Sequence, residues 1–384
     1  MESGECLSTL HCPFSILHSP FPQCLSASVV QKFIECGRIR NMKRYRNKLG
    51  VLTALALSAF ALPLSAQVRS SLATPPLVPT TEYKPLPPPN QPFTWSAWPL
   101  PADWPKSIRV YQGVATDENS LPVRAWFVDV DYNDKTLQAR PFLSMRPEAK
   151  EATSALANKL GALVAINGGY FDMQSKPART FSLVMDEGRI LVPNIDRVRR
   201  KPVHFPVVRA AFGVRNDRRF ETGWVVHDEE GLKLASRPLP NAPGKPVESP
   251  QNFLTRARPW HGVTHAIGGG PILLRRGQID ITYDQEAFFG SGFSRDLPYP
   301  RSAIGSTPDN RLILFVTDGR QPEWSNGLTL PRLAAEMKKL GCVDAMNLDG
   351  GGSSTLVVNG MVLNQPSDGR ERAVTSIFAI VPAN

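Results

Sequence analysis

The chain has 384 residues, of which 42% are apolar and 20% charged, and its formal net charge is +10. This is the composition of a globular protein, and the length allows one large domain or two ordinary ones. Much of the excess of positive charge lies in residues 1–66, which carry seven Lys or Arg and three Asp or Glu; the remaining net charge of +6 is spread along the rest of the chain. After residue 66 the only dense basic run, RVRRK at 197–201, has no interleaved aromatic residues, so we interpret it as a solvated loop rather than a nucleic-acid-binding patch.

Residues 42–66 have the three parts of a secretory signal peptide: a basic start, an apolar run and a small-residue end at Ser65 and Ala66. The apolar run is too short to span a membrane comfortably, and Pro63 interrupts its end, so we favour a signal peptide over a membrane anchor. The sequence therefore predicts an exported protein, periplasmic or secreted, that keeps no stable membrane anchor after cleavage.

Residues 1–41 precede this signal peptide, although a signal peptide should begin the protein. We interpret them as a spurious extension upstream of a true start at Met42. Four of the five cysteines lie in this extension, and only Cys342 remains in the exported chain. We therefore expect no internal disulfide.

Residues 67–105 are rich in proline and are predicted to form an extended tether. Residues 106–384 are predicted to form one domain, which is dominated by strand-like segments and has two helices, at 148–160 and 329–340. Each helix is followed by a short apolar strand, an Asn and a run of glycines. We therefore expect an α+β fold, in which a mixed, mostly antiparallel sheet carries two helix–strand units whose glycine-rich loops form one pocket.

The loop of the second unit reads NLDGGGSS at 347–354. Glycines leave backbone N–H groups free to bind an anion, and serine hydroxyls add further donors. A carboxylate beside such donors stays ionised, so Asp349 could act as a base, a nucleophile or a metal ligand. The alternative is a tight turn with a structural Asp. We favour a functional site, and its candidate residues are Asn347, Asp349, Gly350, Gly351, Gly352, Ser353 and Ser354.

A second carboxylate, Asp318, follows a strand in the segment TDGR at 317–320, where an Asp-Gly pair could also be a simple turn. Arg301, Arg320 and Arg372 lie beside strands. A guanidinium can bind a phosphate with two parallel hydrogen bonds, although each arginine alone could be an ordinary surface residue. Oxygen ligands from Asp349 and Asp318 could also hold a divalent cation such as Ca or Mg, whereas the histidines lack the spacing of a zinc site.

The loop of the first unit reads NGGYFD at 167–172. An aromatic ring beside a glycine turn suits stacking on a sugar face, and it suits core packing equally well. We include this loop among the candidate substrate-binding residues, namely Asn167, Gly168, Gly169, Tyr170 and Asp172.

Six motifs occur along the chain in the order NGGYF, GGGP, PRSAIG, TDGR, NLDGGGSST and ERAVTSIFAI. In this order they resemble the phosphodiester glycosidase family over about residues 160–380. The resemblance implies hydrolysis of a sugar-1-phosphodiester, such as a GlcNAc-1-phosphodiester, at the anomeric carbon. The predicted export separately suggests a phosphoglycan, a sugar-1-phosphate polymer of the envelope or capsule, as the substrate. The products would be a free sugar and a phosphate monoester.

Under this interpretation the arginines Arg301, Arg320 and Arg372, with the glycine amides, would hold the phosphate. Asp349 or Asp318 would activate water or attack the anomeric carbon. The sugar would be oriented by Asn167, Asn347 and Tyr170. Two alternatives stay open: a non-catalytic domain that binds an envelope glycan or exopolysaccharide, and a metal-dependent phosphodiesterase that cuts the P–O bond.

Overall fold

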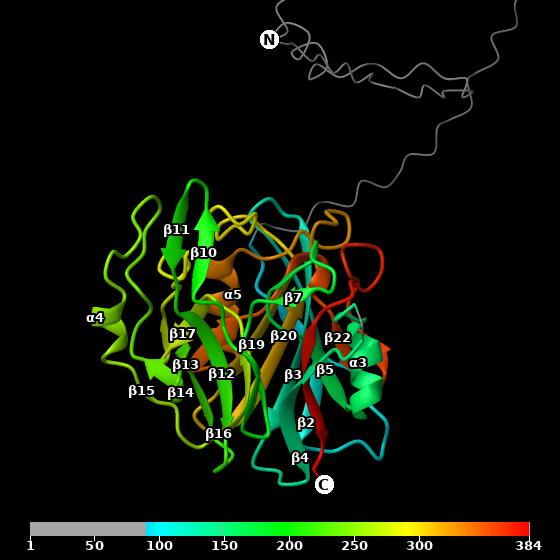
Figure 1. Cartoon of the computed structure of the whole chain (residues 1–384). Helices are drawn as coiled ribbons and strands as arrows, with labels where there is room; N and C mark the ends of the chain where they lie inside the picture. Colours follow the sequence, from blue (N-terminus) through cyan, green and yellow to red (C-terminus); the bar gives the residue numbers. More distant parts are fainter. Residues whose placement is uncertain (1–89, 147, 384) are drawn as a thin grey trace, which may run out of the picture. The chain divides into compact units, whose positions relative to one another are not determined.

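The computed structural model describes residues 90–383 except residue 147 (Figure 1). The predicted extension, the signal peptide and most of the tether lie outside these residues. Within the described part, no helix is long and apolar enough to cross a membrane.

The described part is mostly β-structure, so the predicted α+β class is wrong. Two helices exceed one turn, α3 (Thr153–Leu160) and α5 (Leu330–Lys339), and a single-turn helix α4 spans Gln251–Leu254. The two longer helices lie within the predicted segments, although α3 begins five residues after the start predicted for it. The error concerns the segment between these helices. It forms many short strands separated by turns, and strands this short show too little periodicity for the amount of sheet to be predicted from the sequence.

The largest sheet has eight strands joined by antiparallel pairing. Its outermost strand β1 belongs to residues that the sequence assigns to the tether, and it pairs with β2. The ring of Trp95 in β1 packs edge-on against Phe127, with 4.7 Å between ring centroids. In spatial order the strands are β1 (Thr94–Ala97), β2 (Ile108–Thr116), β3 (Pro122–Asp131), β20 (Arg311–Thr317), β19 (Arg301–Ser306), β21 (Asp344–Asn347), β17 (Ile272–Arg275) and β18 (Gln278–Ile279).

A second sheet has seven strands. In spatial order these are β15 (Arg258–Pro259), β14 (Gly231–Ala235), β13 (Phe220–Asp228), β12 (Arg209–Arg215), β16 (Val263–Gly268), β8 (Val184–Asp186) and β9 (Arg189–Val192).

A third sheet has five strands. In spatial order these are β23 (Met361–Val362), β22 (Leu356–Val358), β5 (Val164–Asn167), β24 (Ser376–Pro382) and β4 (Leu137–Leu143). Two short hairpins complete the strands, β6 (Phe171–Asp172) with β7 (Arg179–Thr180), and β10 (Arg197–Arg200) with β11 (Val203–Pro206).

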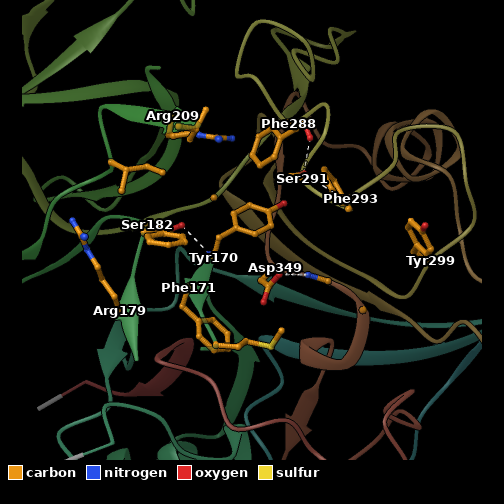
Figure 2. A pocket seen from close by; sticks show the side chains of 18 of the residues that line it. Tyr170, Phe171, Arg179, Ser182, Arg209, Phe288, Ser291, Phe293, Tyr299 and Asp349 are labelled. Carbon is orange, nitrogen blue, oxygen red and sulfur yellow. Dashed lines mark hydrogen bonds between the residues drawn. The ribbon is translucent and has the colours of Figure 1, made fainter. Parts of the chain in front are cut away.

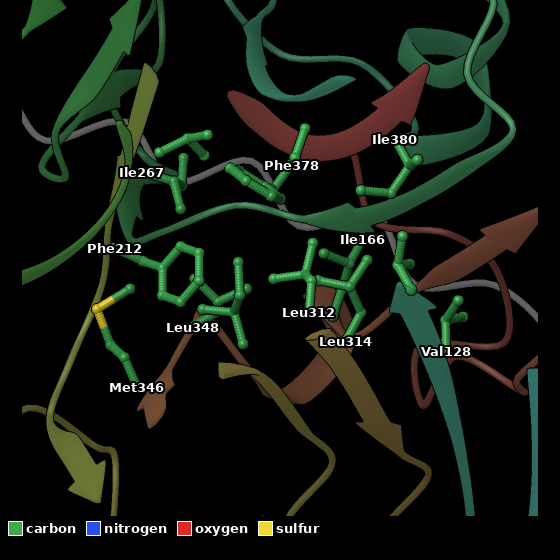
Figure 3. Close-up of a cluster of buried hydrophobic side chains, with 14 of the residues drawn as sticks. Val128, Ile166, Phe212, Ile267, Leu312, Leu314, Met346, Leu348, Phe378 and Ile380 are labelled. Carbon is green, nitrogen blue, oxygen red and sulfur yellow. The ribbon is translucent and has the colours of Figure 1, made fainter. Parts of the chain in front are cut away.

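The main hydrophobic core joins side chains from all three sheets (Figure 3). Leu314 comes from the eight-stranded sheet, Phe212 from the seven-stranded sheet and Phe378 from the five-stranded sheet, and all three are fully buried. Burying a side chain of this size stabilises the fold by about 1.5–3 kcal/mol. The sheets therefore form a single folded unit around a shared interior.

The two helices cover different sheets, and each leads into one of the two glycine loops. Helix α3 packs Leu156 against the five-stranded sheet and leads into β5. Helix α5 is capped by Thr329, whose side chain accepts a hydrogen bond from the amide of Arg332, and it buries Leu333 against the eight-stranded sheet before leading into β21. The loops that follow β5 and β21 then meet, because the Asp349 amide donates to the carbonyl of Gly168 (3.1 Å).

Candidate active site

The two glycine loops meet at a pocket of about 610 Å³ (Figure 2). One part of its wall is aromatic and includes Tyr170, Phe288 and Phe293. The rest is strongly basic, since eight of the lining residues are arginines, and Asp349 is the one carboxylate among the described residues that line it. The lining arginines are Arg179, Arg197, Arg199, Arg200, Arg209, Arg301, Arg320 and Arg372.

Asp349 lies directly after β21, where the chain leaves the sheet and turns into a short 3-10 helix at Gly351–Ser353. Its side chain is enclosed by protein on most sides and opens to the pocket. Burial raises the pKa of Asp349 to about 6, and hydrogen bonds from Ser353 and from the Gly350 amide (2.9 Å), together with nearby arginines, limit this rise. The carboxyl group can therefore exchange a proton near neutral pH, as a general base must.

The glycines of this loop make room for arginines. Gly351 has a φ of 62°, and a Cβ there would lie 3.1 Å from Nη1 of Arg320. At Gly352 a Cβ would lie 2.3 Å from Nη2 of Arg372, which leaves no space for a side chain. The glycine run thus allows two guanidinium groups to approach the loop that carries Asp349.

The amides of the same loop are mostly occupied, unlike the free anion-binding amides that the sequence suggests. The Gly350 amide donates to the Asp349 carboxylate, and the Gly351 amide donates to the carbonyl of Pro300 (2.9 Å). Ser354 is fully buried and does not line the pocket. Among the described residues, the donors available to an anion are therefore arginine side chains rather than this loop's backbone.

Arg301 is fully buried at the start of β19 and reaches the pocket. Its Nε donates to the carbonyl of Leu328 (2.9 Å), and its Nη2 donates to the carbonyls of Ser294 (2.7 Å) and Leu297 (3.0 Å). Its Nη1 has no hydrogen-bond partner among the described residues. Burial lowers the pKa of Arg301 to about 10, so the group stays charged at neutral pH with one donor nitrogen unused.

Arg209, at the start of β12, is a second buried arginine in the pocket, and no pattern in the sequence identifies it. Its guanidinium lies over the ring of Phe288, 3.8 Å from the centroid, and its Nε and Nη1 have no partner among the described residues. Burial lowers its pKa to about 10. A buried polar group without a partner is costly, so two such guanidinium groups beside one pocket favour a bound anion.

Arg320 and Arg372 complete the arginines near Asp349. The Arg320 guanidinium lies over the ring of Tyr299, 4.9 Å from the centroid, and no described residue forms an ion pair with it. Arg372 is held by Asp368, with its Nη2 2.8 Å from Oδ2, and its Nη1 lies 3.5 Å from the Ser353 hydroxyl. The structure therefore brings the three predicted arginines and Asp349 to one pocket.

Asp318, the other predicted carboxylate, does not line this pocket. Its two oxygens accept hydrogen bonds from Trp324 Nε1 (2.7 Å), Asn364 Nδ2 (3.0 Å) and the Gln365 amide (2.9 Å). Burial raises its pKa to about 6. This carboxyl group is positioned to hold the 364–365 segment rather than to meet a substrate.

The two asparagines that precede the glycine loops are fully buried and brace those loops. Asn167 donates to the carbonyl of Asp349 (2.7 Å) and accepts from the hydroxyl of Ser302 (2.7 Å). Asn347 donates to the hydroxyl of Tyr170 (2.9 Å). Neither asparagine lines the pocket, so they position Asp349 and Tyr170 rather than touch a ligand.

The other residues of the first loop divide in the same way. Tyr170 lines the pocket with its ring, and its hydroxyl donates to the carbonyl of Gly270 (2.7 Å). Gly168 and Gly169 pack against Ser376 and Gly268 and do not line the pocket, and Asp172 accepts from the amide of Gln174 in a turn. Of this loop, only the aromatic residues are placed to contact a sugar.

The basic run at 197–201 is not the solvated loop that the sequence suggests. Residues Arg197–Arg200 form β10, which pairs with β11, and Arg197, Arg199 and Arg200 line the pocket. The prediction was wrong because the sequence shows only that several positive charges lie close together along the chain. It does not show that the fold places a pocket beside them.

The geometry does not favour a metal ion held jointly by Asp349 and Asp318, because only Asp349 of these two lines the pocket. Among residues 90–383, no group of three or more His, Cys, Asp or Glu side chains could hold a metal ion. The charge around Asp349 is positive, which suits an anion better than a cation.

Comparison with known proteins identifies the family. Residues 160–381 match the sequence model of the phosphodiester glycosidase family. The chain belongs to this family. The match covers the loops at 167–172 and 347–354, so the resemblance predicted from the six motifs is confirmed.

Relatives in the phosphodiester glycosidase family include N-acetylglucosamine-1-phosphodiester alpha-N-acetylglucosaminidases. The mouse enzyme is 30% identical over 210 residues, which are 54% of this chain and 34% of the mouse protein. The human enzyme is 31% identical over 206 residues, which are 53% of this chain and 33% of the human protein. The chain thus aligns with about a third of the length of these relatives.

The fold is similar to that of the zebrafish N-acetylglucosamine-1-phosphodiester alpha-N-acetylglucosaminidase catalytic domain, which was solved in a form auto-inhibited by its pro-peptide. The TM-score is 0.52 at 23% sequence identity, and the similarity covers 76% of this chain and 91% of the zebrafish chain. This likeness supports the fold of residues 90–383 in this phosphodiester glycosidase.

Proposed function

We propose that the protein hydrolyses the glycosidic C–O bond of a sugar-1-phosphodiester, for which a GlcNAc-1-phosphodiester is the first compound to test. The observation that carries this proposal is one carboxylate, Asp349, in a pocket with eight arginines. The family and the printed activity of its mouse and human relatives agree with it.

The buried arginines would bind the phosphodiester. Arg301 and Arg209 each have unpartnered donor nitrogens, and Arg320 has no carboxylate partner among the described residues. A phosphodiester anion would satisfy these donors with charge-assisted hydrogen bonds. As the C–O bond breaks, negative charge increases on the departing phosphate oxygen, so the same arginines stabilise the transition state more than the ground state.

Asp349 supplies the attack on the anomeric carbon. As a base, its carboxylate takes the proton of a water molecule whose oxygen forms the new bond to carbon, and the phosphate monoester leaves with the electron pair of the broken bond. As a nucleophile, the carboxylate oxygen bonds to the carbon first, and water then releases the sugar. A phosphate monoester is a good leaving group, so neither route needs a second carboxyl group as a strong acid.

The aromatic wall would hold the sugar. Tyr170 lies 5.2 Å from Phe288 between ring centroids, and Asn347 fixes its hydroxyl. Rings fixed in this way present apolar faces for the C–H surface of a pyranose. The sugar would thereby place its anomeric carbon between Asp349 and the arginines.

The test is turnover of a defined GlcNAc-1-phosphodiester by the chain and by Asp349→Asn. Replacing this carboxylate is expected to lower kcat by about 10²–10⁴-fold, as for loss of a general base or nucleophile. Normal kcat in Asp349→Asn would remove this residue from the mechanism. Binding without turnover by the unaltered chain would favour a glycan-binding domain, and loss of activity in chelator would favour a metal-dependent phosphodiesterase.

We also propose that the protein is exported, to the periplasm or outside the cell, on the basis of the basic, apolar and small-residue parts of residues 42–66. The exported form should begin after Ala66. N-terminal sequencing of the protein from the extracellular or periplasmic fraction checks this, and an intact residue 42–66 segment in the cytoplasmic fraction alone would contradict it.

A further inference from the structure

The pocket holds more arginines than one phosphodiester requires. Four of them, Arg209, Arg301, Arg320 and Arg372, belong to the group around Asp349 described above. The other four come from the two short hairpins: one from β7 and three from β10. We call this second set the hairpin arginines, and it consists of Arg179, Arg197, Arg199 and Arg200.

None of the hairpin arginines forms an ion pair with a carboxylate within the described part of the chain. Other arginines here do, such as the half-buried Arg140 with Asp186 and the exposed Arg258 with Glu221. Four like charges gathered at one cavity repel one another unless an anion lies between them. Arg179, Arg197 and Arg199 are exposed, so water weakens this repulsion, but four positive charges at one cavity still attract a negatively charged ligand.

The hairpin that carries three of them is held to the domain. Val198 is buried with Phe205 in a small hydrophobic cluster, and β10 pairs with β11 over four residues. Arg200 donates from Nε to the carbonyl of Ala287 (3.0 Å). The arginines thus project from a supported hairpin, which gives them a defined position along the pocket.

Arg179, one of the hairpin arginines, lies apart from the reaction centre. In Figure 2, the Arg179 side chain and the Asp349 carboxylate lie on different sides of the pocket, with Tyr170 and Phe171 between them. An anion held beside Arg179 is therefore not the group that reacts at Asp349.

Resting on the function proposed above, we propose that the substrate carries a second phosphate, which the hairpin arginines bind. The substrate class is a phosphoglycan in which sugars are joined by successive phosphodiesters. One phosphodiester is cleaved beside Asp349, and the next one along the glycan is held at the hairpin. The sugar between the two phosphates would lie along Phe171 and Phe181, which also line the pocket.

The test compares two substrates that share the same reacting bond. One is the methyl phosphodiester of N-acetylglucosamine, with a single charge. The other is N-acetylglucosamine joined by a phosphodiester to a sugar that bears a methyl phosphodiester, with two charges. The variant is Arg197→Gln with Arg199→Gln. The matched control is Arg189→Gln with Arg256→Gln, two exposed arginines outside the pocket, which removes the same charge.

We expect the unaltered chain to prefer the doubly charged substrate by about tenfold or more in kcat/KM, since arginine–phosphate hydrogen bonds are among the strong ones. In the Arg197/Arg199 variant this preference should fall to near unity, and in the control it should persist. A preference near unity in the unaltered chain, or one that survives in the variant, would overturn the second phosphate site while turnover itself still supports the glycosidase.

If neither substrate is turned over, the proposed glycosidase function fails, and binding decides the second site separately. Titration calorimetry with the doubly charged compound then compares the unaltered chain, the variant and the control. A Kd weakened about tenfold in the variant alone would support the site. An equal Kd in all three, or no binding, would overturn it.

Discussion

Asp349 and Asp318 show how one residue type takes two roles in the same protein. Burial raises the pKa of both carboxyl groups to about 6. Asp318 is surrounded by three donors from fixed protein groups, whereas Asp349 faces a pocket. The hydrogen-bond partners, and not the pKa, therefore separate the structural carboxylate from the candidate catalytic one.

The pKa of Asp349 predicts the acid side of the pH profile. The carboxyl group must be ionised to act as base or nucleophile, so kcat should rise with pH through about 6 and then level off. Steady-state kinetics between pH 4 and 8 measure this. A kcat that is constant across pH 6, or that falls as pH rises through it, would contradict the role given to this carboxylate.

The same pKa predicts that Asp349 destabilises the fold at neutral pH. The folded state binds the proton more tightly than the unfolded state, so ionisation costs stability between the unfolded value of 3.8 and about 6, and the full cost is present above that range. Asp349→Asn should therefore raise the free energy of unfolding at pH 7 by on the order of 1–3 kcal/mol. Urea titrations should show this gain shrink toward zero near pH 4, and an unstable variant at pH 7 would contradict the prediction.

Burial raises the pKa of Asp318 to about 6 as well, so Asp318→Asn also removes a cost of ionisation, but here we expect the lost hydrogen bonds to outweigh that gain. An amide in place of this carboxylate would turn a donor toward Trp324, Asn364 or the Gln365 amide, all of which are donors themselves. We expect a loss of about 1–3 kcal/mol in stability, with kcat reduced far less than in Asp349→Asn. Urea unfolding and kinetics on one preparation check both. If Asp318→Asn were stable but inactive, Asp318 would have to be counted among the catalytic residues.

At the scale of elements, the site depends on two helix–strand units from different sheets. Helix α3 and β5 deliver the first loop, and helix α5 and β21 deliver the second. The helices are predictable from their apolar periodicity and from Gly161 and Gly341 at their ends. The contact between the loops is not predictable, because it depends on which sheet each strand joins.

Asn167 is the residue that ties these elements together. Its side chain accepts from Ser302 of β19 and from the Thr355 amide (3.2 Å), and it donates to the carbonyl of Asp349. Asn167→Ala should lower stability by about 2–3 kcal/mol and also lower kcat, because Asp349 loses its support. Asn158→Ala, at an exposed helix position, is the control. Unchanged kcat in a folded Asn167→Ala protein would show that the loops keep their geometry without this brace.

At the scale of the whole molecule, the pocket is assembled from residues between 170 and 372 that only the complete fold brings together. The motifs predict Asp349, Arg301, Arg320 and Arg372, because each follows or begins a strand in a recognisable segment. They do not predict Arg209, whose strand reads as ordinary buried sheet, or the pocket position of the arginines on β10. The mostly β architecture is missed for a related reason, since short strands carry too few residues for a period to show.

In the proposed reaction, water attacks the sugar carbon while the arginines of the basic pocket hold the phosphate. Hydrolysis of a GlcNAc-1-phosphodiester in water enriched in heavy oxygen tests this most directly, with the label in the products located by mass spectrometry. Cleavage of the C–O bond predicts heavy oxygen in the sugar and a phosphate monoester free of it. Heavy oxygen in the phosphate product would mean attack at phosphorus, and it would contradict the glycosidase mechanism.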